Sequence, residues 1–103
     1  MRFFADPLAI VDIYRLKYKK MPGYNTDIEH NNLKFHVQTQ DQGSSAQYIE
    51  STVYRSGKVL ASRRTYYTNF LNSPTLSEKI KEIIVEQHDA ILKDIAEGVF
   101  DHL

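Results

Sequence analysis

The side chains of this sequence with the most scope for chemistry are four histidines and a basic, tyrosine-rich stretch, residues 62–67 (SRRTYY). The histidines at 30, 36, 88 and 102 fall in an expected turn, strand, helix and tail, so no two share an element as zinc ligands usually do. Cysteine is absent, which excludes disulfides, thiolate metal sites and cysteine nucleophiles. We therefore expect no metal and no cofactor.

Motifs for enzymatic chemistry are also missing from the sequence. It contains neither a G-x-S-x-G nucleophile elbow nor a glycine-rich phosphate loop, and it has only 4 glycines. Two nearby carboxylates, Asp27 and Glu29, share the polar side of a predicted hairpin, which is typical of a solvated strand. Enzyme activity thus has no positive support and is kept only as a remote alternative.

The stretch at residues 62–67 has two interpretations. Arginine forks beside tyrosine rings suit an anion or nucleotide site. In a regular strand, however, consecutive side chains point to opposite faces, so Arg63 and Arg64 would not form one clamp. Arg63 would then pair with Glu50 on the neighbouring strand, while Arg64 would extend past the edge of a helix. We favour this second interpretation, in which the stretch is the edge of a small sheet.

Two hairpins are predicted between residues 24 and 67. In the first, the alternating segments 24–29 and 33–40 flank the turn HNN, where asparagine tolerates positive φ. One side of this hairpin carries Tyr24, Thr26, Ile28, Phe35, Val37 and Thr39.

In the second hairpin, a two-residue turn at Ser56 and Gly57 would pair Val53 with Leu60 and Glu50 with Arg63. One face would hold Ile49, Ser51, Val53, Leu60, Ser62, Arg64 and Tyr66. The opposite face would hold Glu50, Thr52, Tyr54, Val59, Ala61, Arg63, Thr65 and Tyr67.

Residues 73–98 form an amphipathic pattern that predicts one long helix. Thr75 and Glu78 have the spacing of a capping box, and Gly98 is a natural stop. The tail that follows contains Val99 and Phe100, which we expect to fold back onto the core. The inward stripe is Ile80, Ile83, Ile84, Gln87, Ile91 and Ile95, with help from Leu76 and Leu92.

These elements predict an α+β fold in which a long C-terminal helix packs on one face of a four-stranded antiparallel β-meander. We expect residues 1–20 to be an N-terminal extension, with a helix after Asp6 and Pro7 favoured over a strand, and residues 21–103 to be a single domain. Met21 is an alternative natural start.

Composition limits the class of partner. The chain has 103 residues and a formal net charge of +0, which argues against a general nucleic-acid binder. No apolar run approaches the roughly 18–20 residues that span a bilayer, and no signal peptide is apparent. We expect a cytoplasmic protein with no nucleic-acid partner and no membrane contact.

Three segments carry a family resemblance: FHVQTQDQG, IESTVYRSGKVLASRRTYY and EQHDAILKDIAEGVFDHL. They resemble a small bacterial domain of unassigned activity, over residues from about 22 to 102. Gln40 stands where that pattern has an acid, and Tyr66 where serine is common. The resemblance implies a bacterial, cytoplasmic accessory domain. The residues that it carries over are His36, Gln38, Asp41, Arg63, Thr65, Tyr67, Gln87 and His88.

We therefore expect a non-enzymatic interaction or regulatory module that binds a protein partner or a second copy of itself. A small-ligand or anion sensor using His36, Arg63 and Tyr67 is the alternative, and a pocket joining His36 to Arg63 would favour it. Gln87 and His88 are expected to form a structural polar network inside the fold. The candidate binding face comprises His36, Gln38, Glu50, Tyr54, Arg63, Thr65 and Tyr67.

Overall fold

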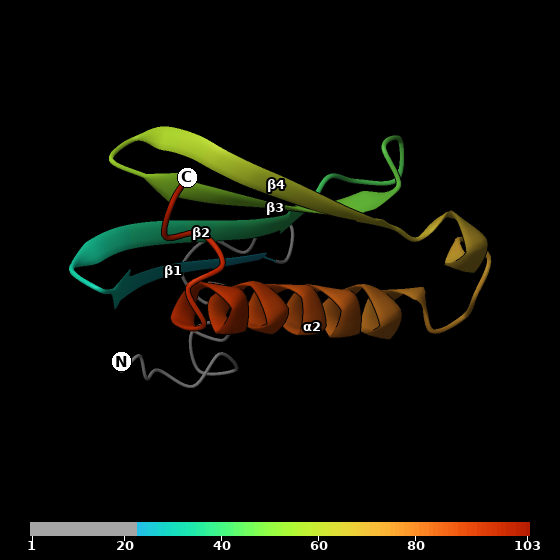
Figure 1. Ribbon diagram of the computed structural model, residues 1–103. Coiled ribbons are helices and arrows are strands. Elements are labelled where there is room, and N and C mark those ends of the chain that lie inside the picture. The colour runs from blue at the N-terminus through green and yellow to red at the C-terminus, as the bar shows by residue number, and fades with distance from the viewer. Residues whose placement is uncertain (1–22) are drawn as a thin grey trace.

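The computed structural model describes residues 23–103, in which one long helix lies against one face of an antiparallel sheet (Figure 1). The strands follow one another in the order β1-β2-β3-β4, so the predicted α+β meander with a C-terminal helix is confirmed. The expected extension at residues 1–20 lies outside the described residues. The elements are β1 (Gly23–His30), β2 (Leu33–Asp41), β3 (Tyr48–Arg55), β4 (Lys58–Tyr66), the 3-10 turn η1 (Thr68–Phe70) and α2 (Leu76–Ala96).

Both hairpins close through two-residue turns with positive φ. Asn31 and Asn32 have φ of 51° and 64°, and Ser56 and Gly57 have φ of 54° and 77°. Such turns match the right-handed twist of the strands that they join, and asparagine and glycine adopt them at low cost. The turn positions predicted from the sequence are confirmed.

A β-bulge changes the register of the second hairpin from the one predicted. Tyr54 pairs with Val59 as a two-residue turn requires, but Val53 then pairs with Ala61 instead of Leu60. Leu60 and Ala61 both pack against the core, because the bulge places two residues of β4 opposite one of β3. The alternation of β4 is therefore shifted by one residue beyond the bulge, and Glu50 pairs with Arg64.

Helix α2 packs mainly on β2 and also on β1 and β3. Strand β4 lies on the far side of β3, at the edge of the sheet (Figure 1). Of the tail residues expected to fold back, Phe100 is buried and Val99 remains exposed. One core cluster, at the hairpin end, comprises Ile28, Phe35, Val37, Val53, Ile91, Leu92, Ile95 and Phe100. The other comprises Tyr24, Ile49, Tyr67, Ile80 and Ile84.

The two ends of α2 differ in how well the sequence predicted them. Gly98 follows the C-cap residue Glu97 and has φ of 83°, as a glycine stop requires. The predicted capping box is wrong, because Thr75 is the N-cap but its side chain makes no cap hydrogen bond. Ser73 Oγ instead accepts the Thr75 N–H at 3.1 Å. No helix within residues 23–103 combines the length and apolarity needed to cross a membrane.

Candidate functional site

The sheet has one face against α2 and one face that no described element covers, which we call the open face. Inward residues such as Val37 and Ile49 are fully buried against the helix, so their neighbours in sequence point the other way. Four of the residues predicted to form the binding face lie on the open face: His36, Gln38, Glu50 and Tyr54.

An aromatic and charged cluster occupies the open face at β3 and β4. The rings of Tyr48 and Tyr66 have centroids 5.0 Å apart, and the Arg64 guanidinium lies 4.4 Å from the centroid of Tyr48. Arg64 Nε donates to Glu50 Oε2 at 3.1 Å. Hydrogen bonds to Tyr66 and Glu50 raise the pKa of the Arg64 guanidinium above its usual value. The cation is thus held between aromatic rings and a carboxylate at the margin of the sheet.

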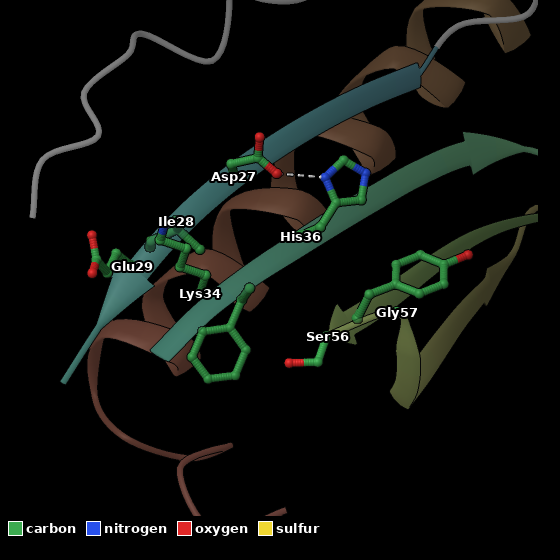
Figure 2. A pocket seen from close by; sticks show the side chains of 9 residues that line it. Asp27, Ile28, Glu29, Lys34, His36, Ser56 and Gly57 are labelled. Atoms are coloured by element: carbon green, nitrogen blue, oxygen red, sulfur yellow. Dashed lines mark hydrogen bonds and ion pairs between the residues drawn. The ribbon is translucent and has the colours of Figure 1, made fainter. Parts of the chain in front are cut away.

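A shallow hollow of about 490 Å³ lies at the hairpin end of the open face. Figure 2 shows Asp27 on β1 and His36 on β2 turned toward each other, with Asp27 Oδ1 2.7 Å from His36 Nδ1. The ring centroids of His36 and Tyr54 are 5.9 Å apart. When neutral His36 donates its Nδ1–H to Asp27, its Nε2 remains as a hydrogen-bond acceptor. The hollow is lined by Asp27, Ile28, Glu29, Lys34, Phe35, His36, Tyr54, Ser56 and Gly57.

Three residues predicted for the binding face lie elsewhere. The bulge turns Arg63 and Thr65 toward the helix, where Arg63 forms an ion pair with Asp94 and Thr65 donates to Gln87. Tyr67 follows the end of β4 and is only 1% exposed. Its hydroxyl donates to Asp41 Oδ1 at 2.6 Å, and burial together with this bond raises the pKa of Tyr67.

These positions separate the residues that the anion-sensor alternative required. His36 lies on the open face, Arg63 lies beside α2, and Tyr67 is part of the core. No pocket described in the structure joins His36 to Arg63. The prediction erred because one unpaired residue at the bulge reverses the facing of Arg63 and Thr65 relative to a regular strand.

The side chains of Gln87 and His88 lie in a chain of hydrogen bonds between the helix and the sheet. His88 Nε2 is 2.8 Å from Thr26 Oγ1, and His88 Nδ1 is 2.7 Å from Thr39 Oγ1. Thr39 Oγ1 is in turn 2.6 Å from Ser51 Oγ, which accepts from Gln87 Nε2 at 2.7 Å. Satisfied buried polar groups of this kind position α2 over three strands.

The partners of Gln87 and His88 were not named from the sequence. The predicted alternation puts Thr26, Thr39 and Ser51 on the inward side of their strands, where they are buried. Because buried polar side chains need hydrogen-bond partners, these inward polar residues were the sequence signal for the network. Burial, with a smaller contribution from His36, lowers the pKa of His88 to about 4. His88 is therefore neutral near pH 7, and as it is 0% exposed it is closed to any substrate.

Comparisons of the chain with protein-family models, with curated proteins and with solved structures found no match. Within residues 23–103, no group of three or more His, Cys, Asp or Glu side chains is arranged to hold a metal ion. The open face carries a cluster of aromatic rings, a shallow hollow and paired charges.

Proposed function

We propose that this protein is a non-enzymatic interaction module that binds a protein partner, or a second copy of itself, through the open face of its sheet. The observation that carries the proposal is the set of tyrosines on that face, Tyr48, Tyr54 and Tyr66, of which Tyr66 is 57% exposed. Tyrosine and arginine are enriched at protein interfaces, because they supply a large contact area together with a hydrogen-bonding end.

The charges of the open face support a protein partner over a nucleic acid. Asp27, Glu29 and Glu50 carry negative charge there, while Lys34 and Arg64 carry positive charge. This near balance provides no net attraction for a phosphate backbone. It suits a protein surface with complementary charges of both signs.

The hollow beside His36 gives the face a place to receive a protruding side chain. Its wall combines the ring of Tyr54, the carboxylate of Asp27 and the imidazole of His36. Binding anchors commonly fill such depressions near an interface, with weaker contacts around them. In the small-ligand alternative, this hollow alone would be the site.

An accessory role in the bacterial cytoplasm agrees with the resemblance of residues 22–102 to a small bacterial domain of unassigned activity. A catalytic role has less support. His88 is buried, and His36 contacts the carboxylate of Asp27 and the ring of Tyr54, neither of which is a nucleophile that a histidine base would activate.

The test replaces tyrosines of the open face and measures association. We expect Tyr54→Ala and Tyr66→Ala to abolish either self-association seen by light scattering or capture of the partner that co-purifies with the wild-type chain. Lys81→Ala, an exposed change on α2, is the matched control and should leave association intact. Association that persists in both tyrosine variants would refute the open face as the interface.

A further inference from the structure

The outer edge of β4 is an unoccupied strand edge within the described part of the chain. β4 is the last strand of the sheet order. The Tyr67 N–H donates to Gln47 O at 2.9 Å, toward the β3 side. Backbone groups alternate in direction along an antiparallel strand, so those of Ser62, Arg64 and Tyr66 point outward. Ser62, Arg64 and Tyr66 thus present their backbone N–H and C=O groups to an incoming strand.

A groove runs beside this edge on the helix side. It has a volume of about 500 Å³, and Ile83 and Ala90 of α2 provide its apolar part. Because α2 packs mainly on β1, β2 and β3, the helix side of β4 borders this groove, and a strand added next to β4 would lie along its outer margin. The inward side chains of such a strand would lie over the groove. The groove is lined by Arg63, Arg64, Thr65, Ile83, Glu86, Gln87 and Ala90.

The charge of β4 indicates what kind of strand it would accept. Lys58, Arg63 and Arg64 are its only charged residues. Arg64 donates to Glu50 through Nε and also hydrogen-bonds Tyr66, while the ring of Tyr48 holds the guanidinium in place. A guanidinium has five N–H groups, so others can still donate to a second carboxylate. A carboxylate on an added strand, on the open side, would meet this arginine.

We propose that β4 accepts an extended segment of a protein partner as a fifth strand. The segment would alternate acidic side chains, placed beside Arg64 on the open side, with aliphatic side chains that cover Ile83 and Ala90 in the groove. This inference rests on the proposed function as an interaction module, and it adds a second contact area and the chemistry of the partner. It is a case of strand addition, in which backbone bonds provide affinity and alternate side chains provide specificity.

Pairing of β4 with β4 of a second copy fits the charges less well. In an antiparallel two-fold arrangement centred near Arg63 or Arg64, arginines of the two copies would lie directly opposite or diagonal to one another. Like charges in cross-strand positions are destabilising. An acidic segment removes that conflict, which is why we infer a partner segment rather than a second copy.

The test uses the full chain and a capped synthetic peptide of about eight residues that alternates aspartate and valine. A lysine–valine peptide of the same length is the charge control. We expect the acidic peptide to shift and protect the amide signals of Ser62, Arg64 and Tyr66 in NMR spectra. The lysine peptide should bind at least roughly tenfold more weakly.

A backbone variant isolates strand pairing from the side chains. Ser62→Pro removes one outward N–H from an exposed edge position, and proline is tolerated at such positions. It should weaken binding of the acidic peptide by roughly fivefold or more, whereas Ser62→Ala should not change it. If Ser62→Pro does not fold, N-methylation of alternate residues in the peptide tests the same bonds without changing the protein.

The proposal would be overturned if the acidic peptide did not bind or if the lysine peptide bound equally well. It would also be overturned if N-methylation of the peptide and, where the variant folds, Ser62→Pro left binding unchanged. Protection of the Ser62, Arg64 and Tyr66 amides in the free, dilute protein would also overturn it, because the edge would then be occupied already. Failure of the proposed function can be told apart from failure of strand addition. Tyr54→Ala changes the open face away from the β4 edge and leaves every outward backbone group of β4 in place, so it tests the proposed function alone.

Discussion

His88 Nε2 lies 2.8 Å from the hydroxyl oxygen of Thr26, which joins the middle of α2 to the edge strand β1 inside the core. The other ring nitrogen is bonded to Thr39, and the ring of Tyr24 meets the imidazole edge-on, with centroids 4.8 Å apart. Both nitrogens are thus satisfied while the ring is fully buried. A histidine in this position stabilises the fold only while it is neutral.

Stability should therefore fall as the solution becomes acidic. The pKa of His88 is about 4 in the folded protein, below its ordinary value of 6.5, so between these values the unfolded chain binds the additional proton. The stabilisation is fully present above about pH 6.5 and is lost progressively as the pH falls toward 4. We expect a loss of about 2 kcal/mol in the free energy of unfolding between pH 7 and pH 5, measured by urea denaturation.

The matched variant for this measurement is His88→Gln, which has a polar side chain that does not titrate. It should be less stable than the wild type at pH 7, and its free energy of unfolding should change much less between pH 7 and pH 5. An equal acid dependence in the variant and the wild type would show that another group is responsible.

The two adjacent arginines should differ in their effect on stability. Arg63 pairs with Asp94 of α2 and lies 5.9 Å from the ring centroid of Phe100, whereas Arg64 pairs with Glu50 on the open face. We expect Arg63→Ala to cost about 1 kcal/mol of unfolding free energy and Arg64→Ala about 0.5 kcal/mol or less, because exposed pairs contribute little. Urea denaturation at neutral pH measures both.

A double-mutant cycle separates the ion pair from the loss of packing. Arg63 and Asp94 should show a coupling energy, whereas Arg63 and Glu50 should not, because the bulge places Arg64 opposite Glu50. Coupling between Arg63 and Glu50 would support the regular register, and so would contradict the bulge.

Removal of the Tyr67 hydroxyl should affect the core rather than binding. Tyr67→Phe keeps the ring but removes the 2.6 Å bond to Asp41, a carboxylate that also accepts the Gly43 N–H at 2.9 Å. We expect a loss of about 1–3 kcal/mol in unfolding free energy, since a buried bond to a charged group is removed. Thermal unfolding checks the stability, and association of the variant should be unchanged. A variant that keeps its stability but loses association would place Tyr67 in the interface after all.

The sequence predicted the elements of residues 23–103 because their signals are local. Asparagine and glycine mark the two turns, alternation marks the strands, and the spacing of isoleucines from Ile80 to Ile95 marks the helix. Periods of two and of 3.6 residues follow from backbone geometry alone. The facing of β1 and β2 was correct for the same reason, since no irregularity interrupts their alternation.

The bulge in β4 opposite Val53 and Tyr54 was not predicted from the sequence, so the facing of Arg63, Arg64 and Thr65 was predicted wrongly. One added residue leaves composition and periodicity almost unchanged, yet it reverses every side chain beyond it. Its advantage is tertiary: it lets both Leu60 and Ala61 pack on the core. The capping box at Thr75 fails for a similar reason. In a capping box the side chain of Glu78 would accept the Thr75 N–H, but Ser73 Oγ accepts it instead.

The amino-acid sequence by itself determined the meander, its turns, the C-terminal helix and the inward residues of β1 and β2, because each of these depends on neighbours a few residues apart. Only the tertiary structure decided which arginine meets Glu50 and which meets Asp94, that Tyr67 is buried, and that His88 is bonded to Thr26 and Thr39. Those relationships join residues far apart in the chain, and they depend on a register that packing against α2 selects.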